Sequence, residues 1–266
     1  MKSPLTLCLL AICLLIFPSV ATASKKAGRA PKEESTKPQP TEEELAMQAF
    51  EAKLNFQRGK IVLPGGLATL DVPDSFRYLA PEQTDMILVE AWGNPPGRKT
   101  LGMLFPSDVS PLKEGGWGVV ITYQEDGHVA DDEASTINYG ELMEGMQEET
   151  AEANEERQQQ GYEPIRIVGW AAPPRYDQAS HKLYWAKELE FGGSPEHTLN
   201  YDIRMLGREG VLSFNAVASM NQLAAIEKDM QKVLGLAEFN SGQRYADYNA
   251  GTDKLAAYGI GALVAG

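Results

Sequence analysis

Residues 198–218 read TLNYDIRMLGREGVLSFNAVA, and this stretch decides the fold class. It divides into two strand regions, 198–206 and 211–218, which are joined by the turn sequence Gly207-Arg208-Glu209-Gly210. Two runs of this kind separated by a short turn that contains glycine are typical of an antiparallel hairpin. The sequence therefore predicts that an antiparallel sheet forms the centre of the domain.

The elements on either side of this hairpin extend the same layout. Two further strand regions, 165–171 and 182–191, precede it, and a long helix at 139–160 precedes those strands. After the hairpin, Asn221 is expected to cap a helix over 222–236. Strands joined by short turns and accompanied by helices predict an α+β fold, a mainly antiparallel sheet flanked by helices. In outline this order resembles Mog1/PsbP-like domains, and a resemblance of fold does not give function.

The first part of the domain shows the same mixture of elements. Thr41 and Glu44 form a capping box that predicts a helix over 42–57. The Gly93-Asn94-Pro95-Pro96-Gly97 segment excludes regular structure and is expected to be a fixed loop. The other elements expected here are strands at 60–63, 67–72, 76–79, 101–105 and 118–123, and a helix at 81–92.

The N-terminus has the three parts of a secretory signal peptide. Lys2 supplies a positive charge, residues 5–17 are apolar, and Ala21-Thr22-Ala23 offers a cleavage site. We therefore expect residues 1–23 to be removed on export to the periplasm or the outer face of the cytoplasmic membrane. An uncleaved anchor is the alternative. A lipoprotein anchored at Cys13 is disfavoured because the preceding Ile12 is bulky.

The rest of the chain divides into three parts. Residues 24–40 are rich in Lys, Pro, Ser and Glu and are expected to form a disordered linker. Residues 41–251 are expected to form a single α+β domain, which is long enough to bury a substantial core. Residues 252–266 are an apolar C-terminal segment, which we expect to be the start of a truncated membrane anchor or part of a soluble member.

Composition excludes several kinds of chemistry. Both cysteines, Cys8 and Cys13, lie in the expected signal peptide, so the mature domain has no thiol for a disulfide or a thiolate metal site. The three histidines lie in different segments without ligand spacing and are expected to be surface or turn residues: His128, His181 and His197. We expect no metal and no cofactor. The chain carries 24 Lys+Arg against 37 Asp+Glu, which disfavours nucleic acid as a partner.

Acidic residues offer two candidate sites, each with a simpler interpretation. Glu188 and Glu190 are alternate residues of one strand, so their separation of about 6.6 Å suits a pair of glycosidase carboxylates. They are equally explained as charges on a solvated strand face, and we assign no catalytic residue. The acidic cluster at 126–133 lacks the ligand spacing of a calcium-binding EF-hand loop and is expected to be a turn before a helix.

The four tryptophans are the most suggestive set for recognition. Three of them flank glycine, and aromatic side chains beside glycine can form a face that stacks on sugars or binds a peptide. The alternative is that these side chains fill the core and fix loops. The candidate binding residues are Trp92, Asn94, Pro95, Pro96, Trp117, Trp170 and Trp185. Among them, the Asn94-Pro95-Pro96 loop is the best single candidate for a recognition surface.

A series of ordered motifs carries a family resemblance over residues 55–266. The motifs are LPGGLATL at 63–70, VP at 72–73, FRYL at 76–79, WGNPPG at 92–97, LGMLFP at 101–106, WGVVI at 117–121, GWA at 169–171, WAKEL at 185–189, LNYDIR at 199–204 and LGR at 206–208. The sequence resembles a bacterial family of uncharacterised, membrane-anchored proteins, filed as a domain of unknown function and sometimes described as regulators of amylopullulanase. The resemblance implies export and an apolar C-terminal anchor, and no catalytic residues come with it. Here 255–266 spans 12 residues, fewer than the roughly 20 that cross a bilayer.

Together these observations favour a non-enzymatic exported, membrane-associated binding or regulatory module. The expected partner is an envelope protein or a glycan. The alternatives are an extracytoplasmic enzyme acting on a glycan or other envelope polymer, and a structural or stress-related envelope protein.

Overall fold

The computed structural model describes residues 41–113 and 115–265. Its main feature is a seven-stranded sheet in the order β3-β4-β5-β9-β8-β7-β6, in which every neighbouring pair is antiparallel. The expected hairpin, β8 (Thr198–Leu206) and β9 (Val211–Ser219), lies at the centre of this sheet. Its turn is closed by a 2.8 Å hydrogen bond from Gly207 N–H to the carbonyl of Gly210. The predicted α+β fold is confirmed.

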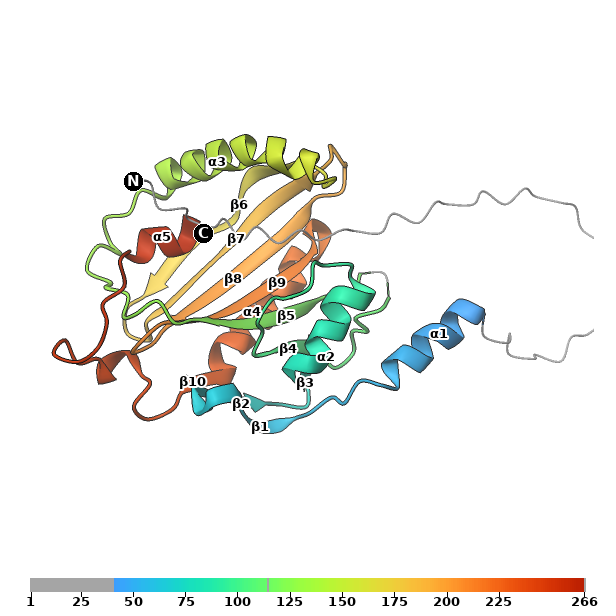
Figure 1. The fold of residues 1–266 in the computed structure, drawn as a ribbon, viewed down its shortest axis with the longest axis horizontal. Coiled ribbons are helices and arrows are strands. Elements are labelled where there is room, and N and C mark those ends of the chain that lie inside the picture. Colours follow the sequence, from blue (N-terminus) through green and yellow to red (C-terminus); the bar gives the residue numbers. More distant parts are fainter. Residues whose placement is uncertain (1–40, 114, 266) are drawn as a thin grey trace, which may run out of the picture.

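The remaining elements complete the large sheet, add a small one and cover both (Figure 1). The other strands of the large sheet are β3 (Phe76–Leu79), β4 (Gly102–Pro106), β5 (Gly118–Gln124), β6 (Ile165–Asp177) and β7 (Lys182–Phe191). The small antiparallel sheet contains β1 (Gly59–Val62), β2 (Ala68–Val72) and β10 (Ala237–Phe239). The helices are α1 (Glu42–Glu51), α2 (Pro81–Asp85), a π-helical continuation of α2 at Met86–Ala91, α3 (Tyr139–Gln159), α4 (Leu223–Leu236) and α5 (Ile260–Ala265).

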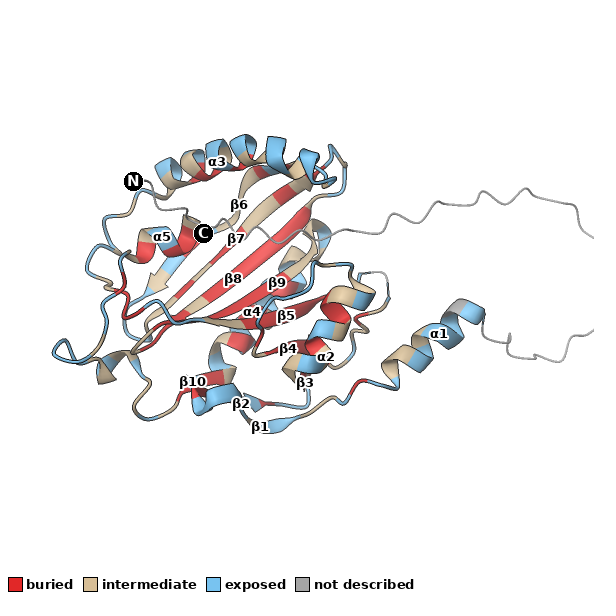
Figure 2. Cartoon of the chain, viewed as in Figure 1, coloured by how far each residue is buried: buried red, intermediate tan, exposed pale blue. Residues whose placement is uncertain are grey.

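Helices pack on both faces of the large sheet. On one face α4 contributes Ile226, Met230 and Val233 to the largest apolar core, which also contains residues of β8 and β9. On the opposite face α3 lies across the β6–β7 end (Figure 1), and its Met143 and Met146 form a smaller core there. Figure 2 shows the outer side of α3 exposed and the central strands largely buried. The two faces of the sheet are therefore packed differently.

The first helix is shorter than the sequence predicts. The capping box of Thr41 and Glu44 is present, but α1 ends at Glu51 instead of residue 57. Leu54 turns into the core, and Gln57 exchanges two backbone hydrogen bonds, of 2.8 and 2.9 Å, with Tyr78. Pairing with β3 therefore determines the conformation of residues that local preference alone would place in the helix.

Two other boundaries also differ from the sequence predictions. β6 continues to Asp177 through Pro173 and Pro174, and its pairing with β7 has irregular register there. Proline is tolerated because β6 is an edge strand, with no further neighbour to receive a hydrogen bond. Before α4, Ser219 rather than Asn221 forms the capping box, with Gln222.

The C-terminal segment folds back onto the domain. In α5, Ile260, Leu263 and Val264 are buried in a core that also contains Trp185. No helix of the part of the chain described here is both long and apolar enough to span a bilayer. The expected signal peptide and linker, at 1–23 and 24–40, lie outside the described residues.

Candidate functional site

Alternation along β8 and β9 separates apolar side chains, which face α4, from a group of polar side chains on the opposite face. Leu199, Tyr201 and Ile203 point into the core beneath α4. The residues between them point to the opposite face, because neighbouring side chains of a strand lie on opposite sides. On that face we define the polar strip, which consists of Lys187, Asn200, Asp202, Arg204, Ser213 and Asn215.

Strand register brings the members of the polar strip side by side. Lys187 is paired with Asn200 across β7 and β8. Asp202 is paired with Asn215, and Arg204 with Ser213, across β8 and β9. Directly opposed side chains on one face of an antiparallel pair contact each other. The six residues therefore form one continuous group, although they come from three strands.

Arg204 is the centre of the hydrogen bonds within the polar strip. Its Nη1 donates to Ser213 Oγ at 2.7 Å and to Gln124 Oε1 at 3.3 Å. Its Nη2 donates to Asp202 Oδ1 at 3.2 Å, and the Asp202 side chain is only 4% exposed. Beside this group, Asn215 Nδ2 donates to Asn200 Oδ1 at 3.2 Å. These hydrogen bonds fix the orientation of the Arg204 guanidinium and the Asp202 carboxylate.

A cavity of about 230 Å³ lies over the polar strip. Its wall beyond the strip consists of Arg98, Lys99, Thr122, Tyr123, Gln124, Met146, Glu149, Thr150, Ile167, Leu189 and Ala265. The wall thus combines the loop before β4, the strand β5, the inner side of α3 and the end of α5. Most of these side chains carry a hydroxyl, amide or charged group, which is unusual for a space beneath a helix.

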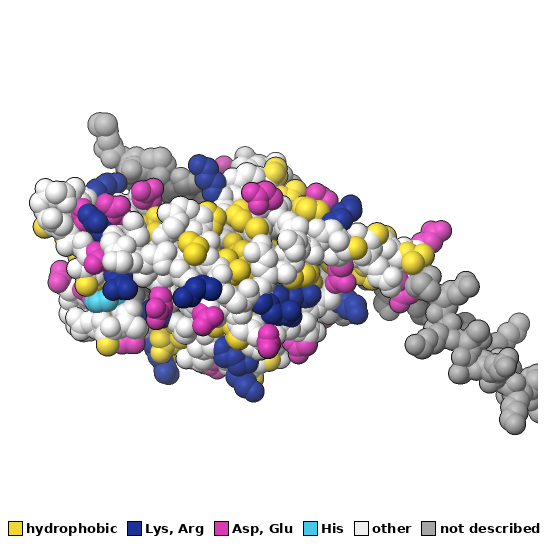
Figure 3. All heavy atoms as spheres, turned by 90° about the horizontal axis from the view of Figure 1, so that it is seen from below, with side chains coloured by type: hydrophobic (Ala, Val, Ile, Leu, Met, Phe, Trp, Pro, Cys, Tyr) yellow, Lys and Arg dark blue, Asp and Glu magenta, His cyan; other side chains and the backbone are white. Residues whose placement is uncertain are grey.

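The charge of the cavity is opposite to that of the whole protein. Among the residues that the structure describes, four basic side chains line it, Arg98, Lys99, Lys187 and Arg204, against the two acidic ones of Glu149 and Asp202. The chain as a whole has a formal net charge of −13. Figure 3 shows that on another face, seen from below, basic and acidic side chains are interspersed. A local excess of positive charge in a partly enclosed space favours an anion.

Burial changes the ionisation of Lys187. Removal from solvent lowers the pKa of its ammonium, the neighbouring Asp202 raises it, and Arg204 lowers it further. The net effect is a pKa below the usual lysine value. Asp202 is the one carboxylate of the polar strip, and it lies beside both Lys187 and Arg204. Tyr123 stays neutral, since burial, with smaller effects of Glu125 and Glu209, raises its pKa to about 12.

The position of α3 above the polar strip is fixed by its own polar side chains. Asn154 donates to the carbonyl of Ile165 and accepts from the N–H of the same residue, both at 2.8 Å. Gln147 donates to the carbonyl of Ile167 at 3.0 Å. These bonds occupy the outer edge of β6, which would otherwise be open. The helix α3, which lines the cavity with Met146, Glu149 and Thr150, is therefore held in place.

The four tryptophans do not form a common surface. Trp117 and Trp185 are buried, with exposed fractions of 3% and 1%, in different cores. Trp92 packs on a third core and donates from Nε1 to the carbonyl of Pro111 at 2.9 Å. Trp170 donates to the carbonyl of Tyr139 at 3.1 Å. Among their glycine neighbours, Gly118 serves packing, since a Cβ there would lie 2.5 Å from the ring of Phe105, whereas a Cβ at Gly93 or Gly169 would meet nothing within 4 Å.

The Asn94-Pro95-Pro96 loop terminates a helix. Asn94 donates to the carbonyl of Leu88 twice, from its backbone at 2.8 Å and from Nδ2 at 3.0 Å. Pro95 and Pro96 are exposed. Neither the loop nor any of the four tryptophans lines the cavity. The loop remains a candidate recognition surface, separate from the polar strip.

The candidate carboxylates Glu188 and Glu190 are joined by a histidine. His197 Nδ1 lies 2.5 Å from Glu188 Oε1, and its Nε2 lies 3.7 Å from Glu190 Oε2. Glu190 also forms an ion pair with Arg166. This arrangement explains both carboxylates as an edge cluster. Within residues 41–113 and 115–265, no three His, Cys, Asp or Glu side chains are placed to hold a metal ion.

The other two histidines come together: His181 lies in a turn, as expected, whereas His128 is buried, contrary to the expectation of a surface or turn residue. His128 is buried and stacks on Tyr248, with ring centroids 3.9 Å apart. Tyr245 contacts both rings: His181 stacks on it with centroids 4.0 Å apart, and His128 lies tilted against it at 4.2 Å. Tyr245 and Tyr248 belong to the segment that follows β10. The cluster therefore holds the C-terminal segment against the sheet.

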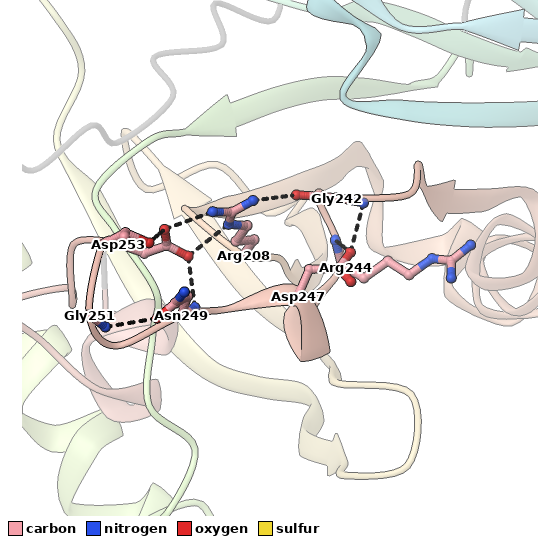
Figure 4. Close-up of polar contacts among 8 residues, drawn as sticks. Arg208, Gly242, Arg244, Asp247, Asn249, Gly251 and Asp253 are labelled. Carbon is pink, nitrogen blue, oxygen red and sulfur yellow. Dashed lines mark hydrogen bonds and ion pairs between the residues drawn. The ribbon is translucent and has the colours of Figure 1, made fainter.

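Arg208, in the turn of the central hairpin, fastens the same C-terminal segment (Figure 4). Its Nε and Nη2 donate to the two oxygens of Asp253 at 2.7 and 2.8 Å. Its Nη1 donates to the carbonyl of Gly242 at 3.2 Å. Asp253 also accepts from the backbone of Asn249 at 2.8 Å. This clamp helps to fix the position of α5, whose Ala265 lines the cavity.

The fold and the polar cavity describe an α+β domain with a candidate site for a small polar ligand. Residues 55–266 match the family described as protein of unknown function (DUF2167), and the chain belongs to this family. No curated protein matches the chain.

Two solved structures share the outline of the fold. One is the solution structure of cyanobacterial PsbP from Synechocystis sp. PCC 6803, at 8% identity and a TM-score of 0.40, covering 70% of this chain and 94% of that one. The other is a mutant of Mog1, at 11% identity and a TM-score of 0.37, covering 70% of this chain and 96% of that one. The comparison concerns fold alone.

Proposed function

We propose that the domain is a non-enzymatic binding or regulatory module whose ligand is a small anion held in the cavity beneath α3. The excess of basic over acidic side chains around the cavity supports this proposal most directly. The enclosure strengthens it, because charges in a partly dry space interact more strongly than charges in water. At about 230 Å³, the cavity suits a ligand smaller than those in typical drug-sized pockets of roughly 300–1,000 Å³.

The same geometry favours binding over glycan hydrolysis. A glycosidase needs two carboxyl groups that flank the bond to be cleaved. Glu149 and Asp202 line the cavity, but Asp202 accepts a hydrogen bond from Arg204 at 3.2 Å. Glu188 and Glu190 are engaged by His197 and Arg166. Glu190 and Asp202 thus each pair with an arginine, and Glu188 contacts His197.

We further propose that the module works outside the cytosol, in the periplasm or at the outer face of the membrane. The signal-peptide pattern of residues 1–23 supports export. Membrane association rests on the resemblance of the sequence motifs to an anchored family. This role requires a partner. It is either an envelope protein that responds when the anion is bound or a glycan that supplies the anion.

A thermal-shift panel tests the ligand proposal. Small carboxylates are compared with their neutral amides at equal concentration. A ligand at about 100 times its Kd stabilises by about 2.7 kcal/mol, which for a domain of this size raises Tm by roughly 5–10 °C. We expect carboxylates to raise Tm and amides not to.

The variants Lys187→Met and Lys228→Met separate the cavity from the general surface. Lys187 lines the cavity, whereas Lys228 is exposed on α4, on the other face of the sheet. We expect the first substitution to abolish the carboxylate effect and the second to leave it unchanged. Equal responses of both variants, or no response of the unmodified protein to any carboxylate, would refute the proposal.

A further inference from the structure

Two atoms in the wall of the cavity lack hydrogen-bond partners among residues 41–113 and 115–265. They are Arg204 Nε, which is a donor, and Asn215 Oδ1, which is an acceptor. The other polar atoms of the same side chains are occupied: both Nη atoms of Arg204 donate within the polar strip, and Asn215 Nδ2 donates to Asn200. Buried polar atoms are almost always paired, so two orphans in one cavity wall need an explanation.

Complementary chemistry identifies what would pair with these atoms. Arg204 Nε requires an acceptor, and a guanidinium prefers a carboxylate oxygen. Asn215 Oδ1 requires a donor, which a ligand can supply as an ammonium or as a neutral group, a hydroxyl or an amide N–H. The guanidinium of Arg204 repels an ammonium and so favours a neutral donor, of which the hydroxyl is the one tested below.

The rest of the wall suits further hydroxyl groups. Thr122 and Ser213 offer hydroxyls that both donate and accept, and Gln124 offers an amide. Both orphan atoms are covered in the present arrangement. Contact with a ligand therefore requires the Asn215 amide and the Arg204 guanidinium to rotate, and rotation of the guanidinium changes its hydrogen bonds to Ser213 and Asp202.

We propose that the ligand is a small polyhydroxylated acid, such as a sugar acid, whose carboxylate faces Arg204 and one of whose hydroxyls donates to Asn215 Oδ1. This inference rests on the proposed function and narrows it to one class of ligand. It also assigns Asn215 as the residue that distinguishes a hydroxy acid from a plain carboxylic acid. A site built to bond a hydroxyl rejects the analogue that lacks it, because its own polar group is then left unpaired.

Calorimetric titration of the full chain with three six-carbon probes tests the inference. D-gluconate has the acid and the hydroxyls, hexanoate has only the acid, and D-sorbitol has only the hydroxyls. We expect gluconate to bind at least about tenfold more tightly than either of the others. Asn215→Leu should reduce the preference for gluconate over hexanoate to near unity. Asn221→Leu, an exposed control, should preserve it.

Each other outcome overturns a definite part of the account. If gluconate and hexanoate bind the unmodified protein equally, the hydroxyl assignment is wrong while the anion site stands. If sorbitol binds as tightly as gluconate, the ligand needs no carboxylate, and the acid part of the inference is wrong. If no probe binds, and simple carboxylates also leave Tm unchanged, both the inference and the proposed function fail. The comparison of probes on the unmodified protein decides the question even if Asn215→Leu does not fold.

Discussion

The guanidinium of Arg204 on β8 donates a 2.7 Å hydrogen bond to the hydroxyl of Ser213 on β9. The two residues are direct cross-strand partners on the face of the sheet that lies opposite the main core. A charged group at this position is expensive to bury unless its hydrogen bonds are met. The polar strip is a candidate site because this charged group lines a cavity that α3 also lines.

The first prediction concerns the single carboxylate within the polar strip. Asp202→Asn removes the carboxylate that Arg204 contacts at 3.2 Å and leaves this guanidinium without its ion-pair partner. Breaking a buried ion pair in this way costs about 3–5 kcal/mol, so we expect a loss of stability of that size in denaturant unfolding. Asp229→Asn, which breaks the exposed pair with Lys232, should cost at most about 1 kcal/mol. Equal losses would contradict a special role for Asp202.

The second prediction compares two glycines. A Cβ at Gly118 would lie 2.5 Å from the ring of Phe105, so Gly118→Ala should destabilise the domain by about 1–3 kcal/mol through overpacking. Gly145 lies within α3 and has no atom within 4 Å of an added Cβ. Gly145→Ala should therefore stabilise by about 0.5–1 kcal/mol, since alanine favours the helix. Thermal unfolding of both variants checks the opposite signs.

The third prediction concerns pH and Lys187. Burial lowers the folded-state pKa of this lysine below its unfolded value of about 10.4. Between the two values the unfolded chain binds more protons, so stability contributed by this group rises with pH in that window. Lys187→Met lacks the effect. We therefore expect the stability of the unmodified protein, relative to Lys187→Met, to increase as pH rises toward about 10.4; a constant difference would contradict it.

The fourth prediction concerns the clamp between Arg208 and Asp253. Arg208→Ala removes two hydrogen bonds to the carboxylate and one to Gly242. We expect faster hydrogen exchange in α5, because the clamp helps to hold the C-terminal segment. The amides of α4 on the other face should be unaffected. Glu209→Ala, an adjacent substitution outside the clamp, should leave exchange in both helices unchanged.

Much of the fold follows from local sequence signals. The glycine-bounded turn at 207–210 and the capping box at Thr41 are correctly predicted, because turns and caps depend on a few neighbouring residues. The end of α1 was predicted wrongly, because Gln57 pairs with Tyr78, a contact that local pattern does not contain. The three-residue strand β10 was missed for the same reason: its partner β2 is distant in sequence.

The candidate site was missed by the sequence analysis for a related reason. The sequence pattern favoured the tryptophans beside glycine as a binding face, but Trp117 and Trp185 are buried in the cores. The signal that was present is the alternation of Asn200, Asp202 and Arg204 with apolar residues along one strand. It reads as an ordinary solvated strand face until the tertiary structure places α3 above it. Only the register of β7, β8 and β9 shows that these groups share one enclosed space.

An NMR titration with a small carboxylate tests the central claim most directly, because backbone amide shifts report where the ligand binds. We predict that the shifts saturate and centre on residues 187, 200–204 and 213–215, with the inner turns of α3 responding as well. Saturable shifts centred instead on the loop at 93–97, or weak shifts spread over the surface without saturation, would contradict the assignment of the polar strip as the binding site.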